Sequence, residues 1–258
     1  MKKFSKAVSC FIVLLLVVAT LPCKNVLANS MVSRKEKLKV LTETGAPDEF
    51  IEKLSEAQID DYYTKFNGKN IVFKGTEEKI IDINENSKDV RADIPTSKLK
   101  ISISCFEDMA ESGGEIYGLI VDAHFEWLKQ PVCSLEDGLM VNWDAEHFYF
   151  QSLYAETGFM LHGTWYPKDT VTAPASITNG GVAWFLDIAS GNLNQGGGSI
   201  YLIPKHTIYS WDDLNMQLVF TYAHQLIGTS ISFGGVVGGS IQISGGDYDR
   251  QATHIIYH

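Results

Sequence analysis

The stretch YGLIVDAHFEW, from Tyr117 to Trp127, alternates between two kinds of side chain. Apolar residues recur at every second position up to Trp127, whereas Asp122, His124 and Glu126 occupy the positions between them. An alternation of period two is typical of a β-strand that buries one face and leaves the other polar. The stretch therefore predicts a strand at the edge of a hydrophobic core.

The same alternation begins at Leu99 and returns in a series of short segments up to the C-terminus. Turn signals separate these segments, for example Glu136-Asp137-Gly138 and Asn179-Gly180-Gly181. Many short strands with frequent glycine turns are typical of a β-sandwich or jelly roll. We therefore predict a mainly β protein, in which residues 98–258 form one antiparallel, sandwich-like or jelly-roll-like all-β domain.

The segment ISFGGVVGGSIQISGG, residues 231–246, is rich in glycine. A phosphate-binding loop is excluded, because no helix and no Gly-Lys-Ser/Thr motif follows. A turn centred on Val237 places Phe233 opposite Ile241 and serines opposite polar residues, and a one-residue shift would destroy this match. We expect a hairpin over residues 230–244 that covers a core. Its arms are shorter than the about 9–11 residues of a membrane strand, although a pore-forming role stays open as an alternative.

Residues 29–68 predict a short helical segment. Ser55 and Gln58 match a capping box, and Asn67-Gly68 matches a helix stop. Helices this short bury too little surface to be stable alone, so we expect them to dock on the β-domain as a small appendage. Residues 69–97 contain the possible strands IVFKG and KIIDI within polar sequence and are predicted to be a linker.

Residues 1–28 have the organisation of a secretory signal peptide. Lysines precede an apolar run from Phe11 to Leu21, which is shorter than the roughly 20 residues of a spanning helix. Cleavage is expected after Ala28. The alternative is a lipoprotein acylated at Cys23, which Pro22 disfavours. We expect a secreted, extracellular protein without a stable membrane span, and this layout is common among exported proteins of Gram-positive bacteria.

The chain is acidic, with 21 Lys and Arg against 31 Asp and Glu and a formal net charge of −10. Removal of the signal peptide would make it more acidic, since that segment carries lysines and no acid. Such a surface repels phosphate backbones, so a nucleic-acid partner is not expected. The sequence offers no cofactor motif and no Cys/His metal spacing, and none is predicted.

Cys105 and Cys133 are the cysteines that remain after the signal peptide. An even number of cysteines in an exported chain predicts a disulfide, here between Cys105 and Cys133. Two buried free thiols are the alternative.

Asp122, His124 and Glu126 share one face of the predicted strand. Such side chains could hold a divalent cation or act as acid and base, although the solvent-facing side of a half-buried strand has the same pattern. Asp144 and neighbouring acids next to Trp143 form a second weak catalytic candidate, because paired carboxylates beside aromatic rings are what glycoside hydrolysis needs. His224 alternates in phase with apolar residues and is expected to be a core histidine.

Aromatic side chains favour a binding role, since they offer a large contact area at low entropic cost. Candidate binding residues are Trp143, Trp165 and Trp211. The sequence therefore predicts a secreted binding or interaction protein, whose partner is a cell-surface glycan or protein. The alternatives are a secreted hydrolase and a membrane-active toxin that uses the hairpin.

Overall fold

The structure is a computed structural model of the 258-residue chain. It describes residues 32–82, 98–129, 136–162, 164–171, 173–188, 193–210, 217–225, 228–234, 239–245 and 252–257. The predicted signal peptide, its cleavage site at Ala28, Cys133 and Trp211 lie outside these residues. Within them, no helix is long and apolar enough to cross a membrane.

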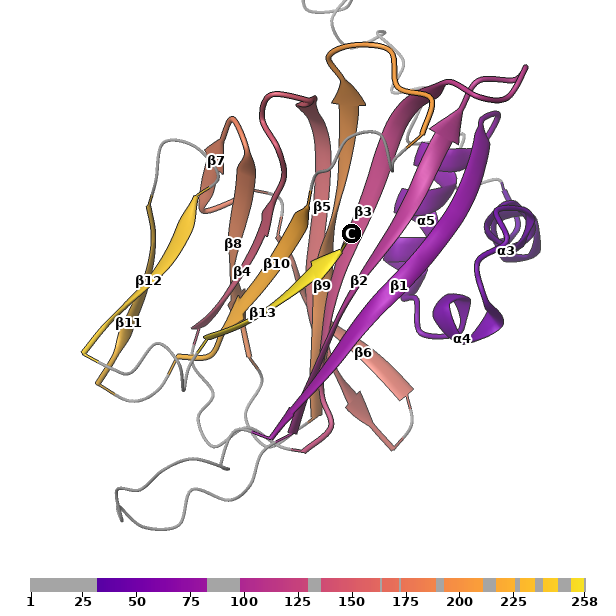
Figure 1. Ribbon diagram of the computed structural model, residues 1–258. Helices are drawn as coiled ribbons and strands as arrows, with labels where there is room; N and C mark the ends of the chain where they lie inside the picture. The colour runs from indigo at the N-terminus through magenta and orange to yellow at the C-terminus, as the bar shows by residue number, and fades with distance from the viewer. Residues whose placement is uncertain are drawn as a thin grey trace, which may run out of the picture.

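Two antiparallel sheets pack face to face (Figure 1). Sheet A has the strand order β1-β2-β3-β9-β5-β6, and sheet B has the order β13-β10-β4-β8-β7. The strands of sheet A are β1 (Asn70–Asp82), β2 (Lys98–Met109), β3 (Ile116–Trp127), β9 (Leu193–Pro204), β5 (Phe148–Leu161) and β6 (Thr164–Thr170). Those of sheet B are β13 (Ala252–Tyr257), β10 (Leu218–Ala223), β4 (Glu136–Asn142), β8 (Gly181–Asp187) and β7 (Ser176–Thr178). The predicted fold class, an antiparallel β-sandwich with a helical appendage, is confirmed.

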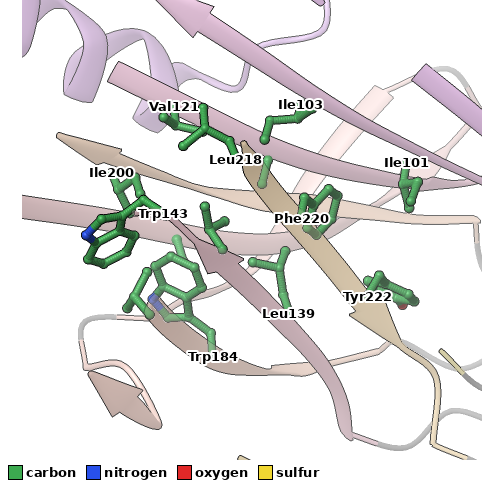
Figure 2. Close-up of a cluster of buried hydrophobic side chains, with 14 of the residues drawn as sticks. Ile101, Ile103, Val121, Leu139, Trp143, Trp184, Ile200, Leu218, Phe220 and Tyr222 are labelled. Carbon is green, nitrogen blue, oxygen red and sulfur yellow. The ribbon is translucent and has the colours of Figure 1, made fainter. Parts of the chain in front are cut away.

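The main core fills the space between the two sheets (Figure 2). Sheet A contributes every second residue of β3 from Leu119 to Trp127, as the alternation predicted. Sheet B contributes Leu139, Trp184 and Phe220, each fully buried. The burial of these large side chains provides the main driving force for folding, at roughly 25 cal/mol per Å² of apolar area.

Three helices lie against the outer face of sheet A (Figure 1). They are α3 (Arg34–Glu43), α4 (Asp48–Ile51) and α5 (Glu56–Phe66). The predicted capping box opens α5, where Ser55 accepts from the amide of Gln58 and Gln58 accepts from the amide of Ser55. We call residues 34–66 the helical cover.

Residues 70–82 form one long strand rather than parts of a linker. β1 pairs with β2 from Asn70 to Asp82, with a register shift between Phe73 and Gly75, inside the first of the two strands that the sequence suggested. This segment is therefore the edge of sheet A, while residues 83–97 lie outside the described ranges.

The glycine-rich segment forms the predicted hairpin of β11 (Ser230–Gly234) and β12 (Ser240–Ser244). Phe233 pairs with Ile241 and Ser232 with Gln242, so the predicted register is confirmed. The hairpin packs on the outer face of sheet B through Ile231 and Ile241, against Met140. A Cβ at Gly138 would lie 3.0 Å from the side chain of Ile231, so glycine is what lets the hairpin approach β4.

Cys105 is a free thiol in the structure rather than half of a disulfide. It lies on the inward face of β2 and is 1% exposed within the main core. Burial raises the pKa of this thiol well above its usual value. A thiol packed in this way behaves as a small apolar side chain.

Candidate functional site

A cavity of about 350 Å³ lies between the helical cover and the outer face of sheet A. Its floor is polar and comes from three adjacent strands, whereas its wall comes from residues 47–58, which include α4 and the start of α5. The floor consists of Thr76 and Glu78 on β1, Lys100, Ser102 and Ser104 on β2, and Asp122, His124 and Glu126 on β3. The wall consists of Pro47, Glu49, Phe50, Lys53, Leu54 and Gln58.

The cavity forms where the outer face of sheet A changes from apolar to polar. Phe106, Ile120 and Tyr201 belong to the apolar cluster on which the helical cover docks. The next outward-facing row, Ser104 opposite Asp122, is polar, and so are the rows beyond it. Helices pack closely on apolar rows and not on polar ones, so a space remains above the polar rows.

The cover changes the environment of Asp122, which is 4% exposed. Burial raises the pKa of this carboxyl to about 7, against the opposing effects of the Tyr62 hydroxyl and of Lys65. The Tyr62 hydroxyl is buried but forms no hydrogen bond of normal geometry, so it does not fix the position of the Asp122 carboxyl. Asp122 therefore exists in both protonation states near neutral pH.

His124 is neutral at the same pH. Burial lowers the pKa of its imidazole to about 4, and the nearby Lys53 and Lys100 lower it further. Its Nε2 atom is buried without a hydrogen-bond partner in the described part of the chain. An unpaired buried nitrogen on the cavity floor is an open position for a hydrogen-bonding ligand.

Charged side chains that line the cavity are partly paired. Lys100 forms an ion pair of 2.6 Å with Glu78, and Glu126 lies opposite Lys100 in the strand register. Thr76 and Ser104 share a hydrogen bond of 2.7 Å. The floor thus offers hydroxyls, carboxylates and an imidazole rather than a cluster of cations.

The three sequence candidates on β3 are therefore brought into one cavity, although none of them hydrogen-bonds another. The alternative reading, a freely solvated strand face, does not hold at Asp122, because α5 covers it. Sequence reasoning missed the rest of the cavity lining, including the wall residues Phe50, Lys53, Leu54 and Gln58. These wall residues lie in the predicted helical segment, but no sequence pattern indicated that this segment packs over β3.

The other sequence candidates lie away from the cavity. Asp144 is part of a turn, in which its carboxylate accepts from the amide of Glu146 at 2.7 Å. Trp143 is 4% exposed in the main core and stacks on Phe150, so it offers no binding surface, contrary to expectation. Trp165 is half-buried on β6.

A second polar network connects the two sheets inside the sandwich. Asp137 is fully buried and accepts hydrogen bonds from the hydroxyl of Tyr222 and the amide of Gln225, and it pairs with His224 Nδ1 at 2.9 Å. The Trp127 indole in turn donates to Tyr222 at 3.0 Å. His224 is the buried, hydrogen-bonded histidine that the sequence predicted, and the network has a structural role.

Comparisons with known proteins found only weak structural similarity to solved domains. No family model and no curated protein matches the chain. The C-terminal domain of BspA, an antigen I/II polypeptide of Streptococcus agalactiae, aligns at 9% identity over 62% of this chain and 57% of that one, with a TM-score of 0.30. The C-terminal domain of the Streptococcus pyogenes antigen I/II-family protein AspA aligns at 7% identity over 63% of this chain and 54% of that one, with a TM-score of 0.31. The chain spans just over half the length of these domains, and this likeness carries no functional argument.

Proposed function

We propose that the protein is a secreted binding protein that takes the end of a neutral cell-surface glycan into the cavity under the helical cover. The observation that carries this proposal is the two-sided chemistry of the cavity, with a hydroxyl- and carboxylate-rich floor facing a wall that presents the apolar side chains of Pro47, Phe50 and Leu54. Its volume of about 350 Å³ falls at the lower end of the range of small-ligand sites, about 300–1,000 Å³.

A sugar ring matches both sides of this cavity. Its hydroxyls can pair with Ser102, Ser104 and the unpaired Nε2 of His124 on the floor. Its C–H face can lie against Phe50 and Leu54 on the wall. Pairing of the His124 nitrogen would also remove the cost of leaving a polar atom buried without a partner.

The charge of the protein favours a neutral glycan over a phosphate-bearing polymer. The chain carries a net charge of −10, and Lys100 is paired with Glu78. A polyanion would be repelled by the whole molecule and would find few unpaired cations in the cavity.

The spacing of the two candidate carboxyls on β3 supports binding rather than hydrolysis by that pair. Asp122 and Glu126 are four residues apart on one strand, and each residue adds about 3.3 Å, so their backbones are about 13 Å apart. Glycoside hydrolysis uses carboxyl pairs about 5–9.5 Å apart. The hairpin alternative is less favoured too, because each docked arm has five residues, against the about 9–11 of a membrane strand.

The test is a glycan array followed by calorimetry on the secreted chain. Ser102→Val, on the cavity floor, should weaken binding of the captured glycan by tenfold or more. Ser232→Val is the matched control, because it makes the same change on the exposed face of β11. A sugar-release assay with Glu126→Gln runs in parallel.

Equal affinity of the Ser102→Val variant and the wild type would place the ligand elsewhere on the molecule. Sugar release that disappears in Glu126→Gln, with the fold intact, would instead establish a hydrolase. Capture of no glycan at all would overturn the proposal.

A further inference from the structure

A buried layer of ionisable groups lies between α5 and sheet A. Asp61 and Lys65 on α5 form an ion pair of 2.6 Å, and both side chains are largely buried. Ser199 of β9 joins them, accepting from Lys65 at 2.7 Å and donating to Asp61 at 2.9 Å. These contacts fasten the helical cover to the sheet.

Two further carboxyls extend this layer on the sheet side. Asp122 of β3 lies opposite Ser199 in the strand register. Glu156 of β5 is 1% exposed and accepts a hydrogen bond of 2.6 Å from the Tyr154 hydroxyl. Asp61, Asp122 and Glu156 are close enough to influence one another electrostatically, whereas Lys65 is the cation that faces Asp122 within the described residues.

The surroundings of Asp122 come from every element packed on it. The titratable and charged groups that face it or its neighbours are Asp61, Tyr62 and Lys65 on α5, Tyr154 and Glu156 on β5, Cys105 on β2, and His124 on β3 with Lys53 and Lys100 beside it.

We propose that this layer makes the cavity pH-gated, so that the helical cover closes firmly over sheet A in mild acid and loosens as Asp122 and Glu156 become ionised beside the Asp61–Lys65 pair. The proposal rests on the proposed function, because it concerns the regulation of the same cavity. When all three carboxyls are charged, Lys65 compensates one of them. The buried carboxylates that Lys65 does not compensate repel one another, and this repulsion favours separation of α5 from the sheet.

The direction follows from the raised pKa values. The pKa of Asp122 is about 7 in the closed state, against about 3.9 for an ordinary aspartate, and burial also raises the pKa of Glu156. A carboxyl with a raised pKa stabilises the closed state fully below its ordinary value, and this contribution is lost as the pH rises towards 7. Ionisation of Asp122 lowers the closing equilibrium constant by up to about tenfold per pH unit within that window, and ionisation of Glu156 acts in the same direction.

The first experiment is hydrogen exchange on the secreted chain without ligand, at pH 5, 6, 7 and 8, corrected for intrinsic exchange rates. Protection of residues 56–66 should fall by at least tenfold from pH 5 to pH 7 and then level off. Asp122→Asn and Glu156→Gln should each flatten this profile. Glu56→Gln is the control, because it removes a carboxyl from the solvent-exposed side of α5.

The second readout is the dissociation rate of the captured glycan, which should rise from pH 5 to pH 7 and rise less in Glu156→Gln. Glu156 does not line the cavity, so its effect would report closure of the cover rather than loss of a contact.

Protection that does not change with pH in the wild type, or that changes as much in Asp122→Asn, would overturn the gate even if a glycan binds. A pH-dependent cover in a protein that binds no glycan would leave the gate standing and overturn the proposed function alone.

Discussion

The two outer faces of the sandwich are both covered, but by different chemistry (Figure 1). The hairpin covers sheet B through apolar side chains such as Ile231 and Ile241, and the space left beside it is about 10 Å³. The helical cover packs on sheet A through an apolar cluster around Phe106, and then continues over polar rows, where about 350 Å³ remains open. A covering element that packs only on apolar residues leaves almost no space beneath it. A covering element that extends beyond the apolar residues and over polar ones leaves a cavity.

The largest expected effect is at the apolar support of the helical cover. Phe106 is fully buried among Phe50, Tyr62, Phe66 and Phe73, with ring centroids 5.1–5.7 Å from its own. Phe106→Ala should lower the free energy of unfolding by about 3–5 kcal/mol, through lost burial and the cavity left behind. Chemical denaturation followed by circular dichroism measures this loss.

The same variant should lose hydrogen-exchange protection in residues 56–66 more than in β10, since the apolar cluster fastens the cover and not the sandwich. A loss below about 1 kcal/mol would mean that polar contacts hold the cover instead.

A smaller effect is expected for the hairpin. Ile241 is 5% exposed on the outer face of sheet B, so Ile241→Ala should cost about 2–4 kcal/mol. Gln242→Ala, on the exposed face of the same strand, should change stability by less than about 0.5 kcal/mol. Because the contacts that the hairpin makes with sheet B are apolar, the cost should be the same at pH 5 and pH 8. A pH-dependent cost would weaken the contrast between the two covers.

The smallest effect is expected for the ion pair between Arg34 and Glu56, which links α3 to α5 at the surface. The two side chains are 57% and 69% exposed, so Arg34→Ala should cost no more than about 0.5 kcal/mol. Thermal unfolding at low and high salt checks this value. A larger, salt-sensitive loss would show that charge pairs, and not the apolar cluster, hold the helical cover together.

Much of the fold was predictable because its signals are local. The alternation from Leu119 to Trp127 identified the buried face of β3, and matched polarity fixed the register of the hairpin. The capping box at Ser55 marked the start of α5. By contrast, β1 was predicted only as two possible strands within a linker, since its pairing with β2 depends on distant sequence.

The cavity was only half predictable for the same reason. Asp122, His124 and Glu126 were visible as one strand face, but a sequence pattern cannot tell whether a polar face meets water or a helix. The wall residues Phe50 and Leu54 lie far away in the chain. Trp143 was misread as a binding residue, because tryptophans suit cores and binding surfaces equally well.

The tryptophans also determine what an optical experiment can see. All five lie at or after Trp127, and the helical cover carries tyrosines instead. Indole emission therefore reports the sandwich, where Trp127 and Trp184 are buried, and is insensitive to the release of α5. Far-ultraviolet ellipticity near 222 nm does respond to the helices, as they contribute most strongly there. The two signals coincide during unfolding when cover and sandwich melt as one unit, and they separate when the cover leaves first.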